Sequence, residues 1–195
     1  MAQEDQQAES QTRESVAGQA LPLAGRVAVV TGSSRGIGRA TALRLARLGA
    51  DLAINYRSDE QGARETREAI EALGRRAIAF QADVSVEEHV IRLFKDIESQ
   101  FGATATILVN NAGTTNDRLI LQMKLDEFES IIRANLTSAF LCTKAALRGM
   151  LKARWGRIVN VASVSGLSGQ LGQANYAASK AGLVALTKST AREVA

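Results

Sequence analysis

The sequence predicts an α/β protein whose parallel sheet is doubly wound and covered by helices on both faces. Short apolar runs rich in Val, Ile and Ala alternate along the chain with longer segments of helical periodicity. Such runs are typical of strands that are buried on both faces. Their alternation with helices indicates βαβ units, and right-handed crossovers then favour the strand order 3-2-1-4-5.

Each element has a local signal in the sequence. The predicted strands are 26–31, 51–56, 77–82, 106–110 and 157–162. The predicted helices are 36–48, 61–73, 85–101, 126–154 and 173–194. Gly49 and Gly74 follow the first two helices, where glycine commonly ends a helix. Ser85 and Glu88 have the spacing of a capping box at the start of the third helix.

The composition suits a single folded domain after a polar tail. The chain has 195 residues, of which 46% are hydrophobic, enough for one domain with a real core. Residues 1–24 are rich in Gln, Glu, Ser and Ala without periodicity, so we expect a disordered tail there and a domain over 25–195. The tail carries several acids and no apolar segment, which excludes a secretory signal and argues against a transit peptide.

Charge and rare residues exclude several functional classes. The net charge is +4 with both signs interspersed, and no basic block indicates nucleic-acid binding. No apolar run approaches the length of a membrane span. Cys142 is the only cysteine, so we expect a reducing compartment, the cytoplasm, with an organelle stroma or matrix left open, and a buried apolar role for this side chain. His89 is the only histidine, which argues against a His triad or a metal site.

A glycine-rich loop directly follows the first predicted strand. It reads Thr31-Gly-Ser-Ser-Arg-Gly-Ile-Gly38 and opens the first helix. Glycines allow a tight turn and a close approach to a pyrophosphate, and a helix N-terminus offers free N–H groups and a positive dipole. A bare glycine triplet is often only a turn, but its place in the first βαβ unit predicts dinucleotide binding in a Rossmann-type fold.

Three polar residues near the end of the chain have the chemistry of carbonyl reduction. Tyr176 and Lys180 are four residues apart, on one face of a predicted helix. Ser163 ends the fifth strand and points toward the crevice where parallel sheets bind ligands. A cation about 4 Å away contributes about 4 kcal/mol at an effective dielectric constant near 20, enough to lower a tyrosine pKa by about three units. Ser163 would then donate a hydrogen bond to the reacting carbonyl. Taken alone, a Tyr and a Lys at this spacing more often mark an exposed helix.

These motifs together resemble the short-chain dehydrogenase/reductase family. The glycine loop has the spacing GxxxGxG, Asn110-Asn-Ala-Gly113 follows the fourth strand, and Ser163, Tyr176 and Lys180 come in the family's order. The likeness covers residues 25–195. Within the family, the segments TGSSRGIGRA, NNAGTTNDRL and GQANYAASKAGL are most similar to the 3-oxoacyl-[acyl-carrier-protein] reductases of type II fatty acid synthesis.

The resemblance implies roles for individual residues. Tyr176 would be the general acid, Lys180 would bind the nicotinamide ribose and tune Tyr176, Ser163 would orient the carbonyl, and Asn135 would hold a water on a proton relay to Lys180. The residues expected to contact the cofactor are Gly32, Ser34, Arg35, Gly36, Ile37, Gly38, Tyr56, Arg57, Ser58, Asp83, Val84, Asn111, Ala112, Gly113, Tyr176 and Lys180. Asp83 has an alternative role as the cap of the following helix.

The end of the second strand predicts which cofactor is bound. An NAD site needs an acid there for the adenosine 2′-hydroxyl. The chain instead has Tyr56-Arg57-Ser58, with Arg35 in the glycine loop. Two arginines suit a 2′-phosphate, so we expect NADPH and reduction as the working direction. The alternative for Arg57 is a solvated loop charge.

The chain also departs from the family pattern. It ends inside the fifth helix, and its only proline is Pro22, so we expect a fragment that lacks the later strands, the Pro-Gly turn and the substrate lid. Strand 157–162 would then be an exposed sheet edge prone to association. The resemblance also implies a homotetramer of the intact protein, formed through the fourth and fifth helices and a last strand that is absent here.

The expected substrate is a 3-oxoacyl group on acyl carrier protein. Lys152, Arg154 and Arg157 could steer that acidic carrier, or could be ordinary charge at a helix end. The alternatives for function are a reductase or dehydrogenase acting on another carbonyl, such as acetoacetyl-CoA, a sugar or another alcohol, and a non-catalytic dinucleotide-binding subunit.

Overall fold

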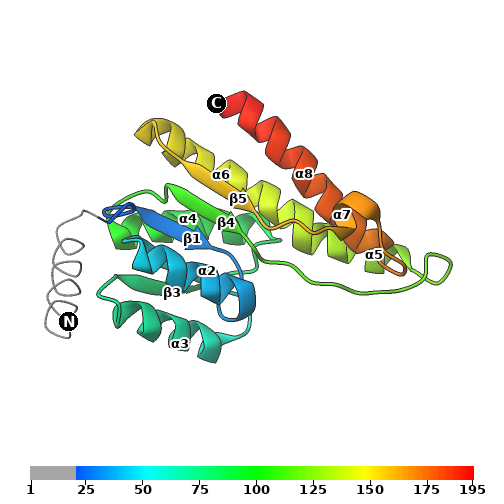
Figure 1. Cartoon of the computed structure of the whole chain (residues 1–195), viewed down its shortest axis with the longest axis horizontal. Coiled ribbons are helices and arrows are strands. Elements are labelled where there is room, and N and C mark those ends of the chain that lie inside the picture. The colour runs from blue at the N-terminus through cyan, green and yellow to red at the C-terminus, as the bar shows by residue number, and fades with distance from the viewer. Residues whose placement is uncertain (1–20) are drawn as a thin grey trace, which may run out of the picture.

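The computed structural model describes residues 21–195, which form a five-stranded parallel sheet with helices on both faces (Figure 1). The strand order is β3-β2-β1-β4-β5, as predicted. The strands are β1 (Val27–Val30), β2 (Asp51–Tyr56), β3 (Ala77–Gln81), β4 (Ile107–Asn110) and β5 (Arg157–Asn160). The helices are α2 (Gly36–Arg47), α3 (Glu60–Glu71), α4 (Glu87–Phe101), α5 (Leu125–Ile132), η1 (Arg133–Thr137), α6 (Ser138–Ala153), α7 (Ser165–Ser168) and α8 (Ala174–Val194).

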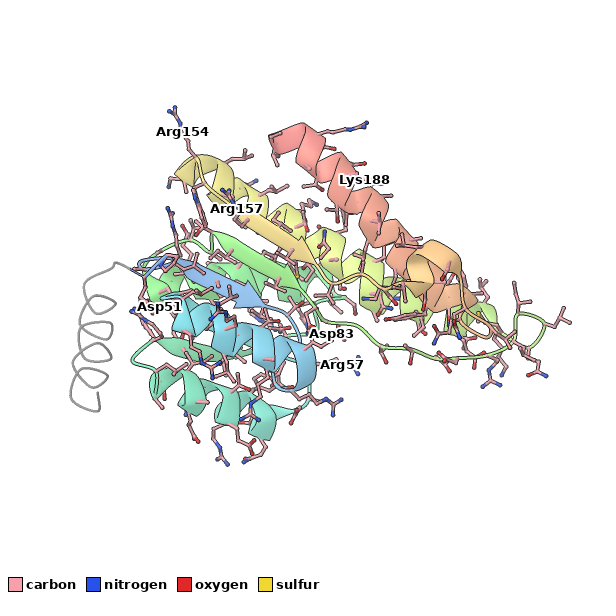
Figure 2. The ribbon with its side chains drawn as sticks, viewed as in Figure 1. Asp51, Arg57, Asp83, Arg154, Arg157 and Lys188 are labelled. Atoms are coloured by element: carbon pink, nitrogen blue, oxygen red, sulfur yellow. The ribbon has the colours of Figure 1, made fainter. Side chains whose placement is uncertain are left out.

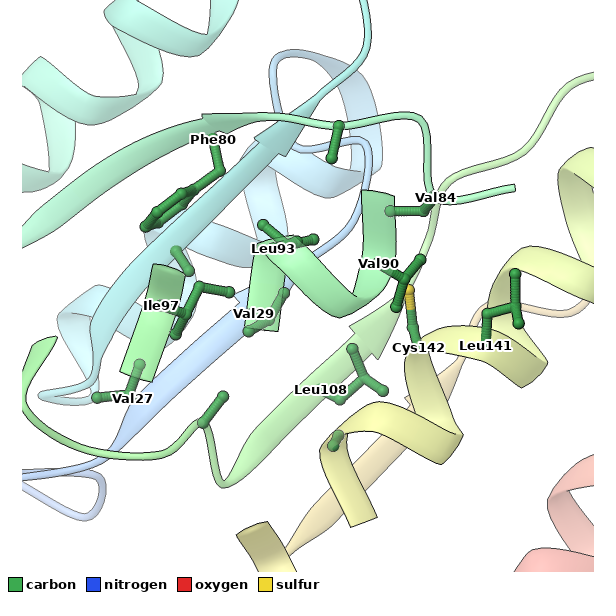
Figure 3. Close-up of a cluster of buried hydrophobic side chains, with 14 of the residues drawn as sticks. Val27, Val29, Phe80, Val84, Val90, Leu93, Ile97, Leu108, Leu141 and Cys142 are labelled. Carbon is green, nitrogen blue, oxygen red and sulfur yellow. The ribbon is translucent and has the colours of Figure 1, made fainter. Parts of the chain in front are cut away.

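Alternate residues of the central strand β1 face the two halves of the core. Val27 and Val29 belong to a cluster with α4 and α6, which includes Leu93 and Cys142 (Figure 3). The intervening side chains of β1 belong to a second cluster with α2 and α3. Because successive side chains of a strand point to opposite faces, apolar runs without alternation are needed to fill both clusters. Cys142 is fully buried, and burial raises the pKa of its thiol to about 12.

The parallel arrangement places the carboxyl ends of all five strands at one edge of the sheet. The loops after β1, β2, β3, β4 and β5 therefore emerge on the same side. Ligands of doubly wound sheets bind at this edge. The glycine loop, Arg57, Asp83, the segment after Asn110 and Ser163 all follow strand ends directly, so the fold brings distant parts of the sequence together here.

The predicted fourth helix is three segments. Residues 126–154 were expected to form one helix, but α5 ends at Ile132, η1 is a π-helix, and α6 begins at Ser138. The wide turn contains the buried Asn135. π-turns of this kind often mark functional sites.

Three smaller expectations also differ from the structure. Ser85 does not cap α4, because its backbone N–H and hydroxyl both donate to Asp83; the helix begins two residues later. The short helix α7 was not predicted. Residues 21–24, placed in the tail, form a turn in which the Leu23 N–H donates to the Leu48 carbonyl oxygen at 2.8 Å. The rest of the expected tail, residues 1–20, lies outside the described residues.

Strand β5 is the edge of the sheet within residues 21–195, as the sequence predicted. Val159 on this strand is 52% exposed. A groove of about 690 Å³ runs beside β5 between the C-terminal halves of α6 and α8, lined by Leu147, Met150, Trp155, Ile158 and Ala191 among others. No helix in the described part of the chain is long and apolar enough to cross a membrane.

Candidate active site

The glycine loop has the backbone that a close approach to phosphate requires. Gly32 and Gly36 have φ values of +62° and +56°, a region that favours glycine. A side chain at Gly38 would overlap the carbonyl oxygen of Gly32, so the first turn of α2 packs directly against the loop. Glycine is therefore required at these positions by conformation or by space.

Asn55, at the end of β2, supports this loop and was not singled out from the sequence. Its side-chain oxygen accepts a hydrogen bond from the Gly32 N–H at 3.2 Å, and its backbone oxygen accepts one from the Ser33 N–H at 2.9 Å. Its amide nitrogen donates to the Ala82 carbonyl oxygen at 3.0 Å. Asn55 is only 2% exposed and so joins the ends of β1, β2 and β3. The N–H groups of Gly32 and Ser33 are consequently occupied by protein.

The N-terminus of α2 leaves backbone donors for a ligand. The N-cap residue Arg35 makes no side-chain cap, and the first turn has no acidic residue. The Arg39 N–H is bonded to the Arg35 carbonyl, as in a regular first turn. The preceding N–H groups of the helix, at Gly36, Ile37 and Gly38, have no intrahelical acceptor. This end of the helix suits an anion such as a pyrophosphate.

A polar cavity of about 180 Å³ lies next to this helix end. Many of the residues predicted to contact a cofactor line it: Ser34, Arg35, Arg57, Ser58, Asp83, Val84, Ala112 and Gly113. Figure 2 shows Arg57 and Asp83 side by side at the carboxyl edge of the sheet, far from Asp51 at the opposite edge. The cavity thus contains two arginines, one of which, Arg35, is the N-cap of α2.

Two of the residues predicted to contact a cofactor, Tyr56 and Asp83, make contacts with other parts of the protein. The Tyr56 side chain does not line the cavity but packs against the core on the α2 and α3 side, because it points to that face of β2. Asp83 lines the cavity but accepts hydrogen bonds from Ser85, at 3.0 Å from its N–H and 2.6 Å from its hydroxyl. Partial burial opposes ionisation, yet these bonds and the charge of Arg57 lower the pKa of Asp83. Asp83 is therefore a carboxylate held beside Arg57.

The segment after β4 is bound to the glycine loop. The Thr31 hydroxyl accepts hydrogen bonds from the N–H groups of Asn111, at 3.0 Å, and Ala112, at 2.9 Å. The Asn111 amide donates in turn to the carbonyl oxygens of Thr31 and Gly32. These contacts hold the two loops in a fixed relation, so Asn111 acts on the cofactor region through the loop backbone.

Tyr176 and Lys180 lie together on α8, next to the end of β5. The Lys180 ammonium donates to the Val161 carbonyl oxygen at 2.7 Å, two residues before Ser163, and lies 5.6 Å from the ring centre of Tyr176. Burial lowers the pKa of Lys180. A side chain at Gly166 would lie 2.7 Å from the Lys180 and Ala181 backbone, so α7 packs closely against α8 and holds Ser163 near this turn.

Asn135 is tied to the same place from the π-helix. Its side-chain oxygen accepts the Thr114 N–H at 2.8 Å, and its amide nitrogen donates to the Thr114 carbonyl and the Ser179 hydroxyl, each at 3.0 Å. A side chain at Gly113 would lie 2.9 Å from the Asn135 oxygen and 3.7 Å from the Lys180 nitrogen. Because both N–H bonds of its amide are donated to protein, the predicted relay water could meet Asn135 only at an oxygen acceptor.

Further supporting residues connect α8 to the loop after β4. The Ser179 hydroxyl donates to the Tyr176 carbonyl at 2.7 Å, and the buried Asn175 donates to the Asn116 carbonyl at 3.0 Å. The Arg118 N–H donates to the Gly172 carbonyl at 2.7 Å. Sequence reasoning missed Thr114, Ser179 and Asn175, although polar residues in the otherwise small-residue segment ANYAASK were a usable signal.

The arrangement places a phenol and a cation close together, near the end of the strand that Ser163 follows. Within the described residues there is no cluster of His, Cys, Asp and Glu that could hold a metal ion. The groups present suit proton transfer to a carbonyl oxygen and stabilisation of the charge that develops on it.

Comparison with known proteins agrees with this geometry. The family model for short chain dehydrogenases matches residues 26–195. The chain is 47% identical over 173 residues to a 3-oxoacyl-[acyl-carrier-protein] reductase of Synechocystis sp., covering 89% of this chain and 70% of that protein. It is 47% identical over 174 residues to the reductase of the same name, FabG, from Pseudomonas aeruginosa, with the same coverage.

A solved structure has the same fold. It is that of a protein from Sinorhizobium meliloti 1021 described as a short-chain alcohol dehydrogenase. The TM-score is 0.85 and the sequence identity 40%, with 90% of this chain and 69% of that chain covered.

Proposed function

Because the chain belongs to the short-chain dehydrogenase family, we propose that it is an NADPH-dependent reductase of 3-oxoacyl groups carried on acyl carrier protein, acting in fatty acid biosynthesis. The observation that carries the proposal is that the Lys180 ammonium lies close to the Tyr176 ring and donates to the Val161 carbonyl oxygen, two residues before Ser163. The reductases of Synechocystis and Pseudomonas, at 47% identity, are named for this substrate.

The residues at the end of β5 would carry out the proton chemistry. Tyr176 donates its phenolic proton to the oxygen of the 3-oxo group as negative charge develops there. Ser163 donates a hydrogen bond to the same oxygen. The Lys180 ammonium, 5.6 Å from the Tyr176 ring centre, favours the phenolate that remains after transfer. A bound nicotinamide cofactor would supply the hydride.

Residues of the cavity at the end of β2 support the choice of NADP. The free N–H groups of α2 suit its pyrophosphate, and Arg35 and Arg57, both in the cavity lining, suit its 2′-phosphate. Arg57→Ala should raise the NADPH Michaelis constant about tenfold, the order of one charge-assisted pair, while NADH kinetics stay unchanged. Arg92→Ala, at an exposed position of α4 outside the cavity lining, is the matched control. A wild-type preference for NADH would contradict the cofactor assignment.

Acyl carrier protein is the proposed partner. Lys152, Arg154 and Arg157 are all exposed, and Figure 2 shows Arg154 and Arg157 at the opposite end of β5 from its carboxyl edge. An acidic carrier would be attracted to this basic surface. We also propose that the protein forms a homotetramer. We further propose a cytoplasmic location, because a reducing compartment suits a protein whose single cysteine is buried and unpaired.

The decisive test is substrate comparison with purified protein. We expect loss of NADPH absorbance with 3-oxoacyl-[acyl-carrier-protein] at a higher kcat/KM than with acetoacetyl-CoA or sugar substrates. Charge reversal at Arg154 should lower kcat/KM for the carrier-bound substrate and leave that for a small thioester unchanged. Equal or better turnover of a sugar, or no turnover of any 3-oxoacyl thioester, would refute the proposal.

A further inference from the structure

The nucleotide cavity holds a carboxylate that the cofactor assignment has not used. Asp59 lines the same cavity as Arg35, Arg57 and Ser58. It comes three residues after the end of β2, beyond the position at which an acid identifies an NAD site. The cavity lining therefore contains two guanidinium groups and two carboxylates, those of Asp59 and Asp83.

The structure fixes the position of the Asp59 carboxylate. Asp59 is the N-cap of α3, and its Oδ1 accepts the Gly62 N–H at 3.1 Å. A side chain at Gly62 would lie 2.6 Å from the Asp59 Oδ2 and 2.7 Å from the Ser34 carbonyl oxygen, so the carboxylate and the glycine loop meet across Gly62. The Thr66 hydroxyl, at 3.3 Å from the same Ser34 oxygen, ties α3 to the loop one turn later.

This carboxylate is ionised and acts on the loop. Hydrogen bonds from the Ser34 hydroxyl and the Gly62 N–H lower the pKa of Asp59; burial opposes them, and the charge of Arg35 adds a lesser lowering effect. Ser34 and Arg35 are residues that would meet the adenosine phosphate. The Asp59 charge therefore offsets part of the positive charge at the place where a 2′-phosphate would lie.

We propose that Asp59 is a specificity-determining residue that limits the preference of this chain for NADP over NAD by placing a negative charge beside Ser34 and Arg35. The inference rests on the proposed cofactor site. NADP carries a dianionic phosphate where NAD carries a hydroxyl, so the Asp59 charge weakens NADP binding and leaves NAD binding unaffected. The carboxylate is also required as a cap of α3, which explains how it can be present in a site for a phosphate.

The test separates the effect of the Asp59 charge from the role of Asp59 as the N-cap of α3. Asn and Ser are both good N-cap residues, so Asp59→Asn and Asp59→Ser keep an acceptor for the Gly62 N–H and remove only the charge. Glu60→Gln removes the same charge from the next residue, which does not line the cavity, and is the matched control. The dissociation constants of NADP⁺ and NAD⁺ are measured by calorimetry on the full chain, with thermal unfolding to compare stability.

In both Asp59 variants the NADP⁺ dissociation constant should fall about three- to tenfold, as expected for removing one charge near a dianion in a solvated cavity, with the NAD⁺ constant unchanged. This gain in NADP⁺ affinity should disappear at high salt. Raising the ionic strength from about 0.01 M to about 1 M shortens the Debye length from about 30 Å to about 3 Å. Glu60→Gln should change neither constant.

Two results would overturn the inference. An unchanged ratio of NADP⁺ to NAD⁺ affinity in both variants would show that the charge does not reach the ligand. Weaker binding of both nucleotides would show that the carboxylate acts only by holding the loop. Failure of the cofactor proposal is a separate outcome, because it would appear as tighter NAD⁺ binding in the wild-type chain.

Discussion

At the scale of single residues, the proposed reaction depends on one phenolic proton. Tyr176→Phe keeps the ring beside Lys180 and removes the hydroxyl, so the fold should be retained. Turnover should fall by at least about a hundredfold, the usual contribution of a general acid. Steady-state rates and the NADP⁺ dissociation constant are measured together, and the latter should stay unchanged. Retention of wild-type turnover would identify another acid and remove the central role of Tyr176.

The buried Lys180 should give the stability of the chain a pH dependence. Burial lowers its pKa in the folded chain below the ordinary value of 10.5. Between the lowered pKa and 10.5 the unfolded chain binds more protons, so the free energy of unfolding rises with pH across this window. Lys180→Met removes this titration.

We therefore expect the stability difference between wild type and Lys180→Met to shift in favour of wild type as pH rises from about 7 to about 10. Urea unfolding measured at each pH provides the comparison. Lys188→Met, at an exposed position of the same helix (Figure 2), should show no such shift. If the stability of both variants relative to wild type changed with pH in the same way, burial would not be lowering the pKa of Lys180.

Among elements, α7 depends on glycine for its contact with α8. The Cβ of Gly166→Ala would lie 2.7 Å from backbone atoms of Lys180 and Ala181, so α7 must move outward. Overpacking of this kind costs about 1–3 kcal/mol of stability. Because α7 follows Ser163, kcat should fall more than nucleotide affinity does. Ser168→Ala, exposed on the same short helix, should change neither quantity. If nucleotide affinity fell by the same factor as kcat, the effect of α7 would not be limited to the surroundings of Ser163.

The elements also show where sequence reasoning succeeded. All five strands and their order were predictable, because each strand contains a short apolar run and the crossovers have one hand. The break at Asn135 was not predictable from periodicity, since the π-turn accompanies contacts with Thr114 and Ser179 that are distant in sequence. Helix α7 has only four residues, too few for a periodic signal.

The same distinction applies to the candidate site. The glycine loop and the spacing of Tyr176 and Lys180 are local patterns, and Lys180 lies 5.6 Å from the ring centre of Tyr176 on the same helix. Asn55 was missed because its role requires β1, β2 and β3 to be adjacent. The Tyr56 side chain packs against the core, which could not be foreseen because the face to which a strand residue points is decided by sheet register.

At the scale of the whole molecule, two apolar surfaces predict two kinds of association. Phe140 on α6 is 47% exposed, on a helix through which the proposed tetramer would form. Val159 is 52% exposed on β5, which is the edge strand of the sheet within residues 21–195. Pairing of such edges is not limited to a closed number of copies, whereas helix faces related by symmetry form a defined oligomer.

Sedimentation of variants should separate the two surfaces. Phe140→Glu places a charge in the helical interface and should shift the chain from the oligomer to a smaller species. Val159→Lys, a charge on the edge, should remove only the heavy aggregates that grow with concentration and leave the defined oligomer in place. Ile91→Lys, at a 60% exposed position of α4, is the control for adding charge to an exposed apolar site and should change neither species. A chain that remains oligomeric in Phe140→Glu but becomes monomeric in Val159→Lys would show that copies associate through β5, and the helical tetramer would have to be abandoned.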